Sequence, residues 1–336
     1  MAVTIRDLAS KLNLSITTVS RALDGYDDVA EETRKRVVEA ARQMGYVPSA
    51  AARQLRRKRT DAIGYILPTS SPRFSDPFYV NFLTGLCDEI ASHHLDTMVT
   101  SSEPDSPEEK QEYRRWVQSH RVDGMVLNRI RVNDWRVNYL SEQNMPFVTL
   151  NSLNYHNNRP CVCVDEGSGV QTLVKHLIDK GHRRLAFIGG PENLVIHQER
   201  IAGYRKGLEA AGISLDPALT VPGDLTEEGG YRAALELLSQ RPRPTAILGC
   251  NDLTALGAAR AAKDRGIYIG TELAIAGYDG IQETEHTNPP ITTLYQPTYE
   301  IARQIADMLI RLIEGKPLET QQVVLQPELI IRPSTG

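Results

Sequence analysis

Residues 4–25 read TIRDLASKLNLSITTVSRALDG, and this stretch decides how the N-terminal part of the chain folds. Thr4 can cap a first helix, because its hydroxyl accepts a hydrogen bond from a free backbone N–H group. Apolar residues then recur at helical spacing as far as Leu12. A two-residue break is followed by Ser15, a second natural cap, so we expect a second helix over residues 16–23.

The second helix has two chemically distinct faces. Val19, Ala22 and Leu23 form an apolar face that we expect to point inward. The opposite face carries short side chains and one arginine, which suit a helix lying against base edges and phosphates: Ile16, Thr17, Thr18, Ser20 and Arg21.

A third helix is expected over residues 31–44, ended by Gly45. Its apolar spacing predicts a buried stripe of Val37, Val38, Ala41 and Met44. The three helices together predict a helix-turn-helix DNA-binding domain. A small three-helix bundle with no role in DNA binding is the alternative.

The charge of the chain is unevenly distributed. The 336 residues carry a formal net charge of −4. Residues 1–60 hold 12 Lys and Arg against 7 Asp and Glu, whereas the remainder holds 26 against 35. This asymmetry favours contact between a polyanion, such as double-stranded DNA, and the N-terminal part alone.

From residue 61 onward, short β-rich segments alternate with amphipathic segments. Strands are expected at residues 63–67, 97–100, 124–127, 147–150, 185–188, 246–248 and 273–276. Helices are expected at residues 78–92, 108–120, 170–180, 200–211, 229–239, 253–265 and 298–314. Such alternation is typical of parallel sheets flanked by helices.

One sheet of so many strands would be very wide, so the predicted fold is an α/β domain of two doubly wound lobes. We expect the first lobe at about residues 61–160 with 291–320, and the second at about 161–290 with 321–336. A ligand would bind in the cleft between them, at the carboxyl ends of the strands.

Polar and aromatic side chains follow several of these strands: Asp76, Phe78, Tyr79, Asn151, Asp165, Arg200, Asn251, Asp252 and Asp279. Aromatic rings stack on sugar or base rings, while carboxylates, amides and a guanidinium bind hydroxyl or carbonyl groups. Other interpretations remain open, since Asp165 and Asp252 could be helix N-caps and Asp279 could be a turn residue before Gly280. The pattern indicates a site for a small polar effector.

Motifs of catalysis and of cofactor or metal binding are absent from the sequence. It contains no G-x-x-x-x-G-K-[ST] loop, no H-E-x-x-H and no G-x-S-x-G. His93 and His94 are adjacent, and we interpret them as solvated surface residues. We therefore expect no enzyme activity, no catalytic residues, no metal and no cofactor.

The four cysteines form neither a disulfide framework nor a C-x-x-C pair. Cys161 and Cys163 alternate within an apolar run, which is typical of a buried strand. No segment approaches the roughly 18 apolar residues of a membrane span, and the first residues lack an export signal. These features predict a cytoplasmic protein with no membrane partner.

Several motifs resemble the lactose-repressor (LacI) family of bacterial transcriptional regulators, along the whole chain. In the N-terminal part they are TIRDLA at 4–9, LSITTVSRALDG at 14–25 and GYVP at 45–48. In the body they are KGH at 180–182, IGGP at 188–191, AILGCND at 246–252 and GYD at 277–279. The resemblance implies a periplasmic-binding-protein-like effector domain. It also implies a homodimeric repressor of palindromic operator DNA, controlled by a sugar or glycoside.

The resemblance also implies roles for residues that would contact DNA. Ile16, Thr17 and Arg21 fall where the family reads bases in the major groove, and Thr4, Ser15, Thr18 and Ser20 are expected to contact DNA beside them. Residues 48–60 match a hinge that folds on DNA, in which Ser49, Ala52 and Leu55 would lie at the minor groove. Leu55 would act as an apolar wedge between base steps. A solvated linker is the alternative for the basic run at 56–59.

Around the effector, the resemblance places Phe78, Tyr79, Asn151, Arg200, Asn251, Asp279 and Gln296. Leu225 departs from the family pattern, because many sugar- or purine-binding members have a stacking aromatic residue there. The predicted domains are a DNA-binding domain at 1–47, a hinge helix and linker at 48–60, and an effector-binding and dimerisation domain at 61–336. A nucleobase-responsive co-repressed regulator, a solute-binding protein and a sugar-processing enzyme are the alternatives.

Overall fold

The computed structural model describes residues 3–46, 59–69, 76–151 and 159–336. The chain separates into two compact units, residues 1–60 and residues 61–336. Each unit has its own hydrophobic core, and each is described by itself.

The N-terminal unit consists of three helices: α1 (Ile5–Leu12), α2 (Ile16–Leu23) and α3 (Glu31–Met44). Thr4 caps α1 in a reciprocal pair with Asp7, and Ser15 caps α2 by accepting a 3.0 Å bond from the Thr18 N–H group. Gly45 ends α3 in the left-handed conformation. The three predicted helices and their caps are confirmed.

Two residues of this unit differ from the sequence-based prediction. Ser20, expected on the exposed face of α2, is only 8% exposed. Val38, expected in the buried stripe of α3, is 51% exposed, and Ala40 occupies the core instead. Among the other predicted core positions, Val19, Ala22, Val37 and Ala41 are buried as expected.

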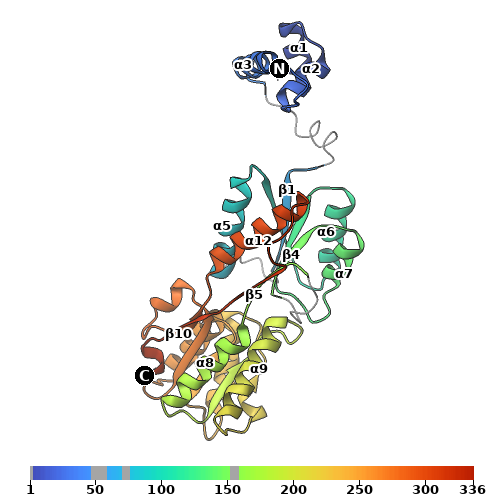
Figure 1. The fold of residues 1–336 in the computed structure, drawn as a ribbon. Coiled ribbons are helices and arrows are strands. Elements are labelled where there is room, and N and C mark those ends of the chain that lie inside the picture. The colour runs from blue at the N-terminus through green and yellow to red at the C-terminus, as the bar shows by residue number, and fades with distance from the viewer. Residues whose placement is uncertain (1–2, 47–58, 70–75, 152–158) are drawn as a thin grey trace. The chain divides into compact units, whose positions relative to one another are not determined.

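The larger unit contains two six-stranded sheets (Figure 1). The first sheet is parallel throughout and has the order β11-β5-β4-β3-β1-β2. Its strands are β1 (Ala62–Pro68), β2 (Asp96–Ser102), β3 (Gly124–Leu127), β4 (Phe147–Leu150), β5 (Cys161–Val164) and β11 (Gln322–Leu325). One face is covered by α5 (Pro77–Ser92) and α12 (Thr298–Ile313), the other by α6 (Pro107–Gln118) and α7 (Trp135–Glu142).

The second sheet has the order β12-β10-β9-β8-β6-β7 and is parallel except for its edge strand β12. Its strands are β6 (Leu185–Ile188), β7 (Thr220–Val221), β8 (Ala246–Gly249), β9 (Ala274–Asp279), β10 (Thr292–Tyr295) and β12 (Glu328–Ile330). Its faces are covered by α8 (Glu166–Asp179) with α9 (Val195–Ala210), and by α10 (Glu227–Ser239) with α11 (Asp252–Asp264). The short 3-10 helices are η1 (Pro217–Leu219), η2 (Gln282–Glu285) and η3 (Pro333–Thr335).

The two-lobed α/β architecture is confirmed, but the predicted lobe boundaries were wrong for three strands. Strands β5 and β11 belong to the first sheet, although residues 161–290 and 321–336 were expected in the second lobe. Strand β10 belongs to the second sheet, although residues 291–320 were expected in the first. The physical reason is strand pairing: β5 pairs with the preceding strand β4, the distant β11 joins β5, and β10 pairs with the preceding strand β9.

None of the helices in the described part of the chain is both long and apolar enough to cross a membrane. Cys161 and Cys163 lie fully buried on β5, as their alternating pattern predicts.

Candidate functional site

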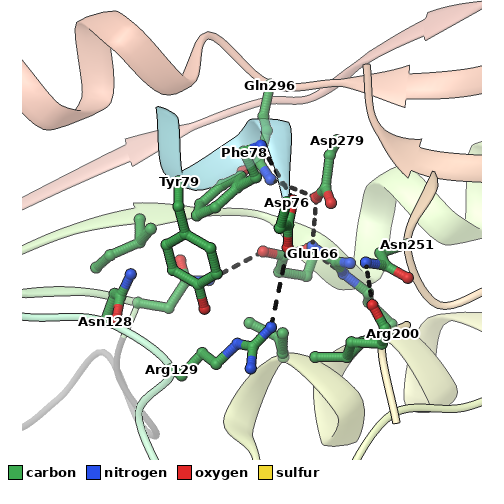
Figure 2. A pocket seen from close by; sticks show the side chains of 14 residues that line it. Asp76, Phe78, Tyr79, Asn128, Arg129, Glu166, Arg200, Asn251, Asp279 and Gln296 are labelled. Atoms are coloured by element: carbon green, nitrogen blue, oxygen red, sulfur yellow. Dashed lines mark hydrogen bonds and ion pairs between the residues drawn. The ribbon is translucent and has the colours of Figure 1, made fainter. Parts of the chain in front are cut away.

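A pocket lies where the carboxyl ends of strands from both sheets meet (Figure 2). We call it the interlobe pocket; its lining residues are Asp76, Phe78, Tyr79, Asn128, Arg129, Leu150, Asn151, Glu166, Ile196, Arg200, Leu225, Asn251, Asp279 and Gln296. Eight of them end a strand or follow one within two residues, which places them at the carboxyl edge of a parallel sheet: Asn128, Arg129, Leu150, Asn151, Glu166, Asn251, Asp279 and Gln296.

A buried ion network forms one wall of the interlobe pocket. Arg200 donates a 2.6 Å bond from Nε to Glu166 and lies 3.6 Å from the carboxylate of Asp279. It also donates to the Cys250 carbonyl, and its guanidinium stands 3.6 Å from the centre of the Tyr278 ring. Burial alone would lower the pKa of Arg200, but the charges of Glu166 and Asp279 raise it, so this guanidinium stays charged.

Asp279 ends strand β9 and accepts a 2.7 Å bond from Nε2 of Gln296, which follows β10. Burial raises the pKa of Asp279 well above its ordinary value, and the nearby Arg200 opposes that rise. These opposed effects make the charge of this carboxyl sensitive to whatever fills the pocket.

The turn after Asp279 is held in place by Asp252, which is fully buried. The Asp252 carboxylate accepts bonds from the N–H groups of Gly280 (2.7 Å) and Ile281 (2.9 Å), and from the Thr293 hydroxyl (2.6 Å). Burial raises the pKa of Asp252 to about 6. Asp252 is the first residue of α11 rather than its N-cap, and it positions Asp279 without lining the pocket itself.

Two of the three pocket asparagines, Asn151 and Asn251, are held by hydrogen bonds on both sides of the amide. Asn151 accepts from the Val164 N–H group and donates to Glu166, both at 2.9 Å. Asn251 is the N-cap of α11, accepting from the Thr254 N–H group and donating to the Leu225 carbonyl, both at 3.1 Å. Because these amides already have hydrogen-bond partners within the protein, their main role is to fix the shape of the interlobe pocket, and they offer few free hydrogen-bonding groups to a ligand.

An aromatic wall lies at the start of α5. Asp76 caps this helix by accepting a 3.0 Å bond from the Phe78 N–H group, so Phe78 and Tyr79 point into the pocket (Figure 2). Arg129, which follows β3, lies over the Tyr79 ring at 5.2 Å and 4.0 Å from the Asp76 carboxylate. Burial raises the pKa of Asp76, and Arg129 opposes that rise.

Eight of the nine predicted effector residues line the interlobe pocket: Asp76, Phe78, Tyr79, Asn151, Arg200, Asn251, Asp279 and Gln296. Asp165 does not line it, because its carboxylate caps α8 by accepting a 3.0 Å bond from the Ser168 N–H group. The next residue, Glu166, points into the pocket instead.

Five lining residues were not identified from the sequence: Asn128, Arg129, Leu150, Glu166 and Ile196. Asn128 and Arg129 follow β3, so the rule that ligands bind after strands could have found them. Leu225 lines the pocket in the left-handed conformation, with a φ of 64°.

In the N-terminal unit, most predicted DNA contacts are accessible. Thr4, Ser15, Ile16, Thr17 and Arg21 are exposed and Thr18 is partly exposed, whereas Ser20 is buried. Arg21 forms a 2.5 Å ion pair with Asp28 and lies over the Tyr26 ring at 5.2 Å. The predicted hinge residues Ser49, Ala52 and Leu55 lie outside the described residues.

Comparison with known proteins agrees with this two-unit organisation. Residues 4–49 match the family described as bacterial regulatory proteins, lacI family, and residues 174–335 match the periplasmic binding protein-like domain. The HTH-type transcriptional regulator AglR of Rhizobium meliloti (strain 1021) is 35% identical over 340 residues, covering 100% of this chain and 95% of the relative. The chain belongs to the lacI family of bacterial regulatory proteins.

Two solved structures of lacI-family proteins are similar along the whole chain. A structure described as a transcriptional regulator CelR–cellobiose complex has a TM-score of 0.77 at 30% identity and covers 99% of both chains. A Lac repressor dimer bound to operator and an anti-inducer has a TM-score of 0.86 at 25% identity, covering 100% of this chain and 99% of that one. This lacI-family protein is therefore a transcriptional regulator, and its relatives are DNA-binding regulators rather than enzymes.

Proposed function

We propose that this lacI-family protein represses transcription as a homodimer on a palindromic operator, and that a neutral sugar or glycoside in the interlobe pocket controls its affinity for DNA. The observation that carries the effector assignment is the pocket itself, which combines an aromatic wall with internally paired charges.

The pairing of charges in the pocket favours a neutral ligand. Asp76 lies beside Arg129, while Glu166 and Asp279 both face Arg200, which makes three carboxylates against two guanidinium groups. Because burial raises the pKa of Asp279, the charges of the pocket come close to balance. A charged ligand would have to disrupt these pairs, and a buried charge left without a partner is costly. Hydroxyl groups can donate to carboxylates and accept from guanidinium groups without changing that balance.

The aromatic wall supports a ring-shaped ligand. Phe78 and Tyr79 offer an apolar surface on which one face of a sugar ring can stack. The CelR structure, a relative at 30% identity, is described as a cellobiose complex, which supports a sugar for this chain. Leu225 adds an aliphatic contact where many sugar- or purine-binding members stack an aromatic ring, so we expect a ligand bound by one aromatic face rather than two.

On the DNA side, residues 1–47 would bind one half-site, residues 48–60 would form the hinge, and residues 61–336 would bind effector and dimerise. Ile16, Thr17 and Arg21 would read base edges from α2 in the major groove. Thr4, Ser15 and Thr18 would contact phosphates near the helix N-termini, and Ser49, Ala52 and Leu55 would contact the minor groove. Ser20 is left out of this surface because it is buried. Such a protein would act in the cytoplasm, where its DNA lies.

Effector and operator would be thermodynamically coupled. If the effector weakens operator binding by some factor, the operator must weaken effector binding by the same factor. Once one DNA-binding domain of the dimer is bound to its half-site, the second domain would bind the other half-site at a high effective concentration. A change in the geometry of the effector domains would therefore change the affinity for DNA strongly.

The test begins with a thermal-shift screen of the full chain against sugars, glycosides and nucleosides, followed by calorimetry of the hits. The operator is selected from random duplex DNA and measured in gel-shift titrations with and without the effector. We expect a sugar or glycoside to bind without turnover and to change operator affinity. Binding by nucleosides alone would replace the sugar assignment, and selection of no DNA sequence would refute the operator assignment.

A further inference from the structure

The face on which α5 packs against α12 carries an imidazole and two carboxylates directed at one another. Glu89 lies in the last turn of α5, His93 is the C-cap of that helix four residues later, and Asp307 lies on α12. One ligand atom from each of the three lies within 4.8 Å of the others. We propose that Glu89, His93 and Asp307 form a binding site for a divalent transition metal of the Zn²⁺ type.

The identity of the ligands selects the class of metal. Imidazole nitrogen together with carboxylate oxygen suits Zn²⁺ and its neighbours, whereas Ca²⁺ and Mg²⁺ prefer oxygen ligands alone. His93 Nε2 already lies 3.4 Å from Oε1 of Glu89, close to the separation of two ligands on one zinc ion. Three protein ligands would leave the fourth tetrahedral position to water.

Two arginines hold the carboxylates without occupying all of their oxygens. Arg303 donates to Oε2 of Glu89 from Nε at 2.9 Å and from a terminal nitrogen at 2.8 Å, which leaves Oε1 facing His93. Arg311 donates to one oxygen of Asp307 at 2.9 Å, so the other oxygen can bind a metal. Partners of this kind orient metal ligands and commonly change affinity 10- to 100-fold.

The surroundings favour a cation despite these two arginines. Glu89 and Glu300 pair with Arg303, Asp307 pairs with Arg311, and Glu319 lines the same surface groove, so four carboxylates stand against two guanidinium groups. Glu89 and Asp307 also line this groove, which gives a hydrated ion a path to their oxygens.

The close packing of α5 against α12 fixes the positions of Glu89, His93 and Asp307 (the trio). A Cβ atom on Gly85 would lie 2.3 Å from the Tyr299 carbonyl oxygen, so the two helices approach there as only glycine permits. Asp76 and Phe78 meet the interlobe pocket at the opposite end of α5. The metal site is therefore separate from the effector site, and it replaces the interpretation of His93 as a merely solvated residue.

The experiment is calorimetric titration of the full chain, freed of metal by chelator and dialysis, with zinc chloride. We expect one saturable site per chain with a micromolar Kd. His93→Ala and Asp307→Asn should each weaken that Kd at least about tenfold while retaining the wild-type circular dichroism spectrum. His94→Asn is the matched control, because His94 is the adjacent exposed histidine outside the trio, and asparagine tolerates its left-handed φ of 59°.

Three outcomes overturn the proposal. The first is the absence of saturable zinc binding tighter than about 100 μM in the wild-type chain. The second is a His93→Ala variant that binds zinc like the wild type. The third is an equal loss of affinity in His94→Asn, which would assign the binding to dispersed surface histidines.

Discussion

Replacing Asp279 by asparagine separates a ligand-binding role from a structural one. The substitution keeps the size of the side chain and removes its charge. Asp279 has a φ of 118°, and asparagine tolerates positive φ values as well as aspartate does. The amide oxygen can still accept the bond that Gln296 donates at 2.7 Å. The turn therefore stays intact, and the substitution should weaken only those contacts that a ligand makes to the carboxylate from the pocket side.

The expected magnitude follows from the contacts of Asp279. A hydrogen bond from a ligand hydroxyl to a charged acceptor is worth about 1.5–3 kcal/mol, so the effector Kd should rise roughly 10- to 150-fold. The loss of folding stability should be smaller than the 3–5 kcal/mol typical of breaking a buried ion pair. Arg200 lies 3.6 Å from Asp279 but keeps its 2.6 Å bond to Glu166.

The assay is calorimetry with the effector found in the screen, alongside thermal unfolding of the same preparation. The matched control is Asp165→Asn, because Asp165 caps α8 outside the interlobe pocket and asparagine is an equally good N-cap. We expect the control to bind effector like the wild type. Normal effector affinity of Asp279→Asn at normal thermal stability would refute the reasoning and leave Asp279 as a turn residue.

Three further predictions concern other parts of the chain. Arg21→Ala should weaken operator binding by about 1–3 kcal/mol in gel-shift titrations and leave effector affinity unchanged, because Arg21 projects from the exposed face of α2; unchanged operator affinity would contradict its assignment as a base contact. Gly85→Ala should lower the free energy of unfolding by about 1–3 kcal/mol in urea titrations, since its methyl group would meet the Tyr299 carbonyl at 2.3 Å; wild-type stability would show that α5 and α12 separate easily. Burial, and then the neighbouring Glu166, raise the pKa of Glu199 from 4.5 to about 8. The folded chain therefore binds a proton at Glu199 more tightly than the unfolded chain does. As the pH rises between those two values, the contribution of Glu199 to the free energy of unfolding decreases. The Tm of Glu199→Gln, measured by calorimetry, should therefore exceed the Tm of the wild type by more at pH 8 than at pH 5. An equal difference in Tm at both pH values would contradict this account.

The sequence by itself determined the elements whose causes are local. Thr4 and Ser15 cap the first two helices of the N-terminal unit and Gly45 caps the end of the third, because caps and apolar spacing act over a few neighbouring residues. The positions of Asn251 and Asp279 were predictable for a related reason. Each follows a buried parallel strand, and the carboxyl ends of such strands meet at one edge.

Only the tertiary structure decided which lobe receives each strand. Residues 161–164 and 322–325 pair with each other across more than 150 residues of chain, and no local pattern encodes that pairing. It also decided which of two adjacent acids serves the site, since Asp165 caps α8 while Glu166 binds Arg200. A rotation of one position around a helix or strand end changes which side chain faces the pocket, and packing against distant residues sets that rotation.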